Sequence, residues 1–172
     1  GNRLSAVGFT VAEKILRTAR IKGRSLVYQG KPLTSERLRF AIESAILAEG
    51  GRPDDTIVAG GDQACDPHER GFGPLRPHQL IIIDIFPRVV ATGYFGDMTR
   101  TYLKGRASEA QRQLCATVKA AHGRAINAVR AGVDGRAVHQ EVVATFDAAG
   151  YKTTHGKNGS TGFFHGTGHG LG

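Results

Sequence analysis

The sequence of 172 residues predicts an α+β fold in which helices pack against an antiparallel sheet. Two observations favour this fold. Several stretches begin with a helix-capping residue and continue with apolar residues at helical spacing. Between them lie short runs of branched apolar residues bounded by Gly, Pro and Asp, which are typical of strands. A hydrophobic content of 40% and a charged content of 22% fit a globular chain with its own core.

Two helices are predicted in the first third of the chain. Thr10 and Glu13 fit a capping box, so the first helix is expected over about residues 10–21. Thr34 or Ser35 caps a second helix, which stops at the glycine pair 50–51. The apolar face of this second helix is expected to comprise Leu38, Ile42, Ala45 and Ile46.

Four strands are predicted next, "TIVAGG", "QLIIID", "RVVATGY" and "RTYL", with the Pro- and Gly-rich loop "DPHERGFGPLRP" after the first. If residues 80–85 and 96–103 flank a bent hairpin, Asp84 and Asp97 face one another. An ionised carboxylate at the end of an isoleucine strand is costly unless it is paired or bound to a cation. A divalent cation would offset the repulsion of two carboxylates. Alternatively, Asp97 caps a turn and Asp84 simply ends its strand.

The last third predicts two more helices and a histidine-bearing end. Ser108 and Gln111 form a capping box, and Asp134 caps the following helix. "YKTTHGKNGSTG" is expected to be a polar loop. Read as a strand, "FFHGTGHGLG" (163–172) places His165 and His169 on one face and glycines on the other. The alternative is a flexible glycine-rich tail. The expected helix faces are Leu114, Val118, Ala121, Ala125 and Val129, then Val138, Val142 and Phe146.

Charge and composition argue against some partners. The net charge is +8, but its one dense basic cluster, at residues 17–24, has no interleaved aromatic residues, so no nucleic-acid partner is expected. No stretch is apolar for long enough to span a bilayer, so no membrane association is expected either. Cys65 and Cys115 match no metal-binding or redox spacing, which favours two reduced thiols in a cytoplasmic protein.

"IIIDIFPRVVATGYFGDMTRTYLKG", followed by "FFHGTGHGLG", resembles the pita-bread metallopeptidases, which include aminopeptidase P, prolidase and methionine aminopeptidase. "GYFGDMTRT" and the upstream Pro67-His68 pair are most similar to the branch that cleaves Xaa-Pro bonds. The resemblance implies a curved antiparallel sheet with helices packed on its outer face. The resemblance extends over residues 1–172. It implies that they form a single catalytic-type domain whose last strands are missing.

The resemblance also implies a site for two divalent metal ions, commonly manganese, cobalt, zinc or iron. Asp84 corresponds to the first carboxylate ligand, Asp97 to the bridging carboxylate and His169 to the imidazole ligand. His68 and His165 correspond to non-ligand histidines that hold the substrate and stabilise the tetrahedral intermediate. The implied reaction is attack of a metal-activated hydroxide on the N-terminal Xaa-Pro bond of a peptide or dipeptide.

The sequence departs from the family pattern in three places. Phe86 stands where the family usually has glycine, and the loop between the aspartates is about two residues longer. The glutamate ligands and further histidine that the family carries after the HGxGHGxG stretch are not in this sequence. The chain is therefore expected to bind metal weakly and to have little peptidase activity alone. It is expected either to be a fragment of a longer protein or to complete its sheet as a homodimer.

Two alternatives to a metallopeptidase remain at this point. The same fold occurs in metal-free hydrolases of the creatinase kind, which have no need of both Asp84 and Asp97. A non-catalytic module that holds a peptide or protein is the other alternative, and the absent glutamates favour it.

Overall fold

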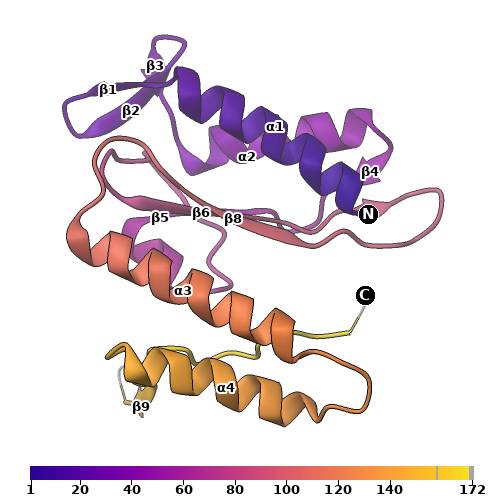
Figure 1. Cartoon of the computed structure of the whole chain (residues 1–172). Coiled ribbons are helices and arrows are strands. Elements are labelled where there is room, and N and C mark those ends of the chain that lie inside the picture. The colour runs from indigo at the N-terminus through magenta and orange to yellow at the C-terminus, as the bar shows by residue number, and fades with distance from the viewer. Residues whose placement is uncertain (158, 171–172) are drawn as a thin grey trace. The chain divides into compact units, whose positions relative to one another are not determined.

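The computed structural model describes residues 1–157 and 159–170 (Figure 1). The chain divides into two compact units, Gly1–Ala107 and a second unit that begins at Ser108. Each is described by itself.

The first unit holds two α-helices, one 3-10 helix and three small sheets, all of whose strand pairs are antiparallel. The sheets have the orders β1-β2-β3, β4-β7 and β5-β6-β8. The elements are α1 (Asn2–Thr18), β1 (Arg20–Lys22), β2 (Ser25–Tyr28), β3 (Lys31–Pro32), α2 (Ser35–Ala48), β4 (Gly51–Arg52), β5 (Ile57–Gly60), a 3-10 helix (Gly61–Cys65), β6 (Leu80–Ile85), β7 (Arg88–Val89) and β8 (Met98–Leu103).

The core of this unit lies between the helix pair α1–α2 and one face of the β5-β6-β8 sheet (Figure 1). Alternate residues of β6, Ile81, Ile83 and Ile85, are each 0% exposed and join the core. Their neighbours Ile82 and Asp84 point to the opposite face and are half-buried. The predicted isoleucine strand and its hairpin with residues 96–103 are therefore confirmed.

The first helix begins earlier than predicted. α1 starts at Asn2 and ends at Thr18, and the Thr10 hydroxyl donates to the Ala6 carbonyl 2.9 Å away instead of capping a helix. The prediction of a start at residue 10 was wrong because the buried stripe of α1 already includes Leu4 and Phe9. Residues 20 and 21, predicted to be the end of this helix, belong to β1, and the β1-β2-β3 sheet continues through residue 32.

The second helix matches its prediction. The Thr34 hydroxyl accepts from the Arg37 amide at 3.2 Å, and Leu38, Ile42 and Ile46 are buried. The predicted strand "RVVATGY" is shorter than expected, because only Arg88–Val89 pair with β4 and the chain then turns at Gly93, whose φ is +78°.

The second unit contains α3 (Glu109–Ala128), α4 (Gly135–Ala148), β9 (Thr154–Gly156) and β10 (Gly159–Thr161). Both predicted helix starts are confirmed. Ser108 and Gln111 form the capping box, and the Asp134 carboxylate accepts from the Arg136 amide at 2.9 Å. The α3 face was predicted too wide, since Val118 and Val129 are exposed. The buried cluster comprises Ala121, Ala125, Val138, Val142 and Phe146.

The chain after α4 differs from the predicted polar loop at 151–162 and from the predicted strand at 163–172. The expected polar loop contains the antiparallel β9–β10 hairpin, in which Thr154 pairs with Thr161. Residues 163–170 form no strand, and the predicted residues 171–172 lie outside the described part. A strand needs a partner for its backbone groups, and none of the described strands pairs with this segment. Side chains hold it instead: the Phe163 ring stacks on Phe146 with 5.1 Å between the ring centroids.

Within the described part of the chain, no helix is both long and apolar enough to cross a membrane. Cys65 and Cys115 are free and exposed, as the sequence predicts for reduced thiols.

A pair of glycines tests the packing of the loop before β6. Gly71 and Gly73 both have left-handed backbones, with φ of +80° and +72°. A Cβ on Gly71 would lie 1.9 Å from the Val58 carbonyl oxygen, whereas one on Gly73 would meet nothing within 4 Å. Gly73→Ala is expected to cost about 1–2 kcal/mol of unfolding free energy from its backbone alone. Gly71→Ala should cost clearly more in urea titrations, and equal losses would contradict this packing.

Candidate metal-binding site

The two aspartates of the hairpin lie on the same face of the β5-β6-β8 sheet. Asp84 of β6 pairs directly with Thr99 of β8 in the antiparallel ladder. Asp97 lies two residues before Thr99, so side-chain alternation directs it to the face that carries Asp84 and Thr99. We call these three residues the carboxylate face. It is opposite the face that carries the buried isoleucines.

The environment of Asp84 makes its charge costly. Burial raises the pKa of the Asp84 carboxyl above its ordinary value, and the negative charge of Asp97 raises it further. The Thr99 hydroxyl, which donates to Oδ1 of Asp84 at 2.5 Å, acts in the opposite direction. A cation bound at this face would offset the repulsion between the carboxylates of Asp84 and Asp97.

Phe86 continues the carboxylate face toward the tip of the hairpin. The pairing of Ile85 with Met98 and the bridge of Arg88 with Phe95 leave two residues between them on each strand, so no residue is inserted. Phe86 therefore lies opposite Asp97. The sequence marked this phenylalanine as a departure from the family pattern, and the ladder places it beside the carboxylates.

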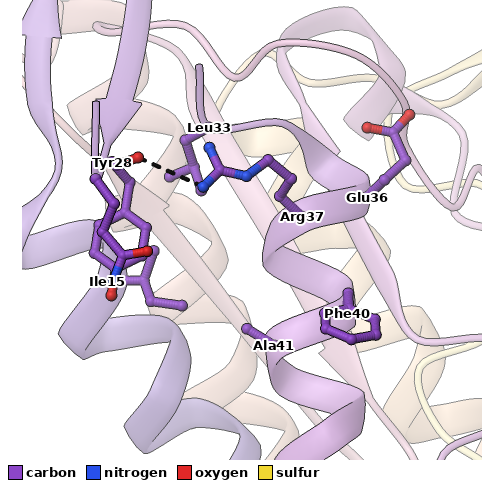
Figure 2. A pocket seen from close by; sticks show the side chains of 8 residues that line it. Ile15, Tyr28, Leu33, Glu36, Arg37, Phe40 and Ala41 are labelled. Carbon is purple, nitrogen blue, oxygen red and sulfur yellow. Dashed lines mark hydrogen bonds between the residues drawn. The ribbon is translucent and has the colours of Figure 1, made fainter. Parts of the chain in front are cut away.

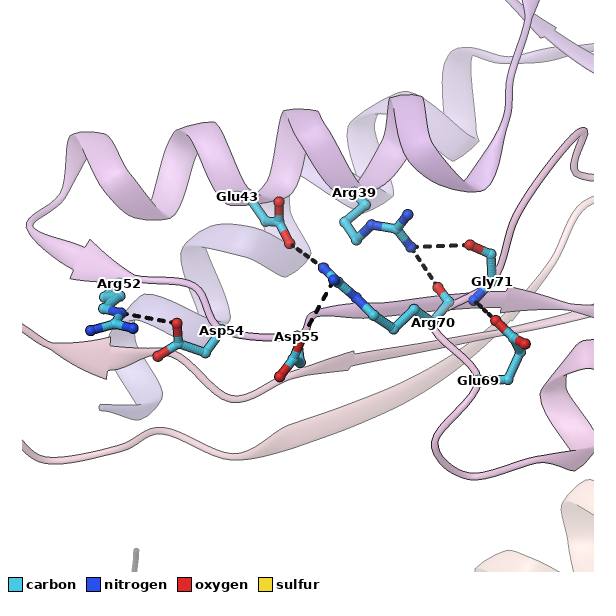
Figure 3. Close-up of polar contacts among 8 residues, drawn as sticks. All are labelled: Arg39, Glu43, Arg52, Asp54, Asp55, Glu69, Arg70 and Gly71. Atoms are coloured by element: carbon cyan, nitrogen blue, oxygen red, sulfur yellow. Dashed lines mark hydrogen bonds and ion pairs between the residues drawn. The ribbon is translucent and has the colours of Figure 1, made fainter.

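His68 is exposed and lies in the loop before β6. Figure 3 shows how α2 holds the next residues of this loop, Arg70 and Gly71. One guanidinium nitrogen of Arg39 donates to the carbonyl oxygens of Arg70 and Gly71, at 2.6 and 3.1 Å. The Arg70 side chain forms an ion pair with Glu43 of α2 at 3.6 Å. The loop that carries His68 is thus anchored to a rigid helix through its main chain.

His165 and His169 belong to the second unit. Their Nδ1 atoms lie 2.9 and 2.8 Å from the carbonyl oxygens of Gly166 and Gly170, and both residues are exposed. The His165 ring meets the Phe163 ring edge-on at 4.7 Å between centroids. His165 lines a cavity of about 540 Å³ together with residues of α4 and the β9–β10 hairpin.

The sequence did not single out two residues of this cavity. Nδ1 of His139 lies 2.8 Å from Oγ1 of Thr167, and Arg136 also lines the cavity. No local motif connects these residues, because His139 and Thr167 are 28 positions apart. The sequence contains one sign of this cavity: Arg136 and His139 are three residues apart, so a helix directs both side chains to the same side.

A second cavity of about 350 Å³ lies in the first unit between α1, α2 and the β2–β3 hairpin (Figure 2). It is lined by Ile15, Tyr28, Gln29, Leu33, Glu36, Arg37, Phe40 and Ala41. The Arg37 guanidinium spans its edge by donating to the Tyr28 and Pro32 carbonyls. None of the predicted site residues lines this cavity.

The residues present suit a divalent cation in their chemistry. Carboxylate oxygens and imidazole nitrogens bind hard to borderline metals, and the carboxylate face supplies two carboxylates that lie near one another. Within residues 1–157 and 159–170, no group of three His, Cys, Asp or Glu side chains gathers closely enough to hold a metal ion. The carboxylate pair is therefore the part of the predicted ligand set that the structure brings together.

Fold and site define a chain of the pita-bread metallopeptidase class. The sequence model of metallopeptidase family M24 matches residues 4–172, and the chain belongs to this family. The crystal structure of the prolidase from Pyrococcus horikoshii OT3 matches 99% of this chain and 43% of its own, with a TM-score of 0.79 and 20% identity. This likeness confirms the predicted pita-bread fold.

Two relatives are similar in sequence. The Xaa-Pro aminopeptidase of Haemophilus influenzae is 35% identical over 115 residues, which cover 62% of this chain and 26% of that protein. The Xaa-Pro dipeptidase of Lactobacillus helveticus is 29% identical over 122 residues, covering 69% of this chain and 30% of that protein. The chain thus spans less than a third of the length of these curated relatives.

The raised pKa of Asp84 predicts a specific pH dependence in metal-free buffer. A carboxyl whose folded-state pKa lies above its unfolded value destabilises the fold once it ionises, so stability falls as pH rises through the folded pKa. Asp84→Asn removes this charge. Its stability relative to the unaltered chain should therefore be lowest in acid and increase toward pH 7.

Urea unfolding between about pH 3.5 and pH 7.5, with a chelator present, measures this difference. Asp54→Asn is the matched control, because Asp54 forms an exposed ion pair with Arg52 at 2.9 Å. An Asp84→Asn difference that does not change with pH would contradict the assignment.

Proposed function

We propose that the chain is part of a metal-dependent peptidase that hydrolyses the N-terminal Xaa-Pro bond of peptides or dipeptides. The observation that carries the proposal is the carboxylate face, where Asp84 and Asp97 share one side of a hairpin whose other side is buried. Membership of metallopeptidase family M24 supports it. The names of the relatives, Xaa-Pro aminopeptidase and Xaa-Pro dipeptidase, support the substrate class.

In this proposal Asp84 and Asp97 hold divalent cations, with His169 as a further ligand, and manganese, cobalt, zinc and iron are the candidates. Such a cation, when bound, activates water at neutral pH and polarises the scissile carbonyl. Thr99 orients the Asp84 carboxylate through its short hydrogen bond. Carboxylates so placed would hold the cation from one face of the sheet.

His68 and His165 are proposed to act on the substrate. A protonated imidazole donates a hydrogen bond to the developing oxyanion and passes a proton to the leaving amine. The Arg39 anchor of the His68 loop supports this role, because a catalytic histidine must be held in place. For His165 the support is its sequence motif together with its place in the wall of a cavity.

The remaining parts of the proposal concern the setting of the enzyme. Residues 1–172 form one catalytic-type domain, the partner is a peptide, and the protein works in the cytoplasm. A homodimer would extend the β5-β6-β8 sheet at β8, one of its two outer strands.

Metal binding gives a direct test. The chain is expected to bind Mn²⁺ weakly, and Asp97→Asn should weaken this affinity by more than about tenfold, since even the loss of a residue that supports a ligand costs that much. Electron paramagnetic resonance of free Mn²⁺ measures the affinity. Hydrolysis of an Xaa-Pro dipeptide by the same samples should depend on Mn²⁺ and be lost with Asp97→Asn.

Asp54→Asn again serves as control and should leave both readouts unchanged. If Mn²⁺ affinity is the same in the unaltered chain and in Asp97→Asn, the carboxylate face is not a metal site. Xaa-Pro hydrolysis that persists in Asp97→Asn would contradict a role of the carboxylate face in the reaction.

A further inference from the structure

The first turn of α1 contacts the main chain beside Asp84 in β6 and at Asp97, which directly precedes β8. The Ser5 hydroxyl donates to the carbonyl oxygen of Ile85, the residue after Asp84, at 3.0 Å. Oδ1 of Asn2 accepts from the backbone N–H of Asp97 at 3.1 Å. Residues three apart on a helix share a face, so a single turn holds the main chain of both strands.

Packing at this junction leaves no room for displacement. Ser5 is 0% exposed. A Cβ on Gly96 would lie 2.6 Å from Oγ of Ser5 and 2.5 Å from the carbonyl carbon of Gly1. A Cβ on Gly8 would lie 2.9 Å from Cδ1 of Ile85. Helix and hairpin therefore approach as closely as glycine allows.

The contact between α1 and β8 continues along the whole strand. Arg100 lies over the Phe9 ring, the Tyr102 hydroxyl donates to Glu13, and Lys104 donates to the Arg17 carbonyl. The helix rises about 22 Å from Asn2 to Arg17, and extended chain from Asp97 to Lys104, one residue beyond each end of β8, would span about 23 Å. The side-chain contacts of Arg100, Tyr102 and Lys104 therefore follow α1 toward its C-terminal end.

We propose that Asn2 and Ser5 are positioning residues of the carboxylate pair. By fixing the main chain at Asp97 and Ile85, they fix the separation at which the two aspartates meet a divalent cation. This inference rests on the proposed function in one respect, namely that the pair binds such a cation. Both residues act through the backbone and not through the cation.

Two readouts test the positioning role. The first is hydrogen exchange of the Asp97 amide in a chelator, without metal. Asn2→Ala removes the acceptor and should speed this exchange about tenfold, as expected for the loss of one hydrogen bond. Asn2→Asp keeps an acceptor oxygen and should restore slow exchange. Thr10→Ala is the matched control, because the Thr10 hydroxyl bonds a carbonyl within α1 itself.

The second readout is Mn²⁺ affinity, measured where urea titrations show every variant to be folded. Asn2→Ala and Ser5→Ala should each weaken the affinity about tenfold, as the loss of supporting partners does in other metal sites. Asn2→Asp and Thr10→Ala should retain it. Should Ser5→Ala fail to fold, Asn2→Ala carries the test, because Asn2 is exposed.

The outcomes separate the two proposals. Unchanged Asp97 exchange in Asn2→Ala overturns the positioning role, whatever the metal does. Faster exchange with unchanged Mn²⁺ affinity also overturns it, while the metal site stands. Absence of Mn²⁺ binding in the unaltered chain overturns the metal proposal and the positioning role with it. Faster exchange and weaker binding that Asn2→Asp restores support both.

Discussion

The antiparallel ladder between β6 and β8 is the constraint on which the candidate site depends. Side chains alternate along a strand, so burying Ile81, Ile83 and Ile85 against the helices also directs Asp84 to the other face. A slip of one residue would bring the aspartate into the core and the isoleucines out of it. The hydrophobic core therefore determines where the carboxylates point. No separate interaction of the carboxylates is needed to direct them to this face.

That arrangement has an electrostatic cost, which the same strands reduce only in part. Asp84 is half-buried, and the Thr99 hydroxyl directly across the ladder stabilises its ionised form, yet burial and Asp97 still raise its pKa. A site of this kind disfavours two bare negative charges and favours a bound cation. The interactions that make the metal-free face unfavourable are those that would make a divalent cation bind there.

The sequence predicts those features of the fold that depend on residues near one another in the chain. The isoleucine run, the caps at Thr34, Ser108 and Asp134, and the aspartate hairpin all follow from short-range rules. It mispredicted the start of α1, because no side chain caps that helix and a buried stripe defines it. It also mispredicted a strand at 163–170. The alternation of histidines and glycines favours a strand, but it does not supply the neighbouring strand that the backbone must pair with. His139 was missed because its contact with Thr167 is made by tertiary structure.

Long-range contacts also explain how the candidate residues are held. Ser5 and Asn2 reach hairpin residues 80 and 95 positions away, and Arg39 of α2 reaches the loop of His68 some 31 positions on. Each of these hydrogen bonds ends on a main-chain group and not on a candidate carboxylate or imidazole group. A rigid helix that holds the backbone can therefore set the position of a functional side chain without occupying the atoms that a ligand requires. The two helices that build the core of the first unit thereby also position its candidate site.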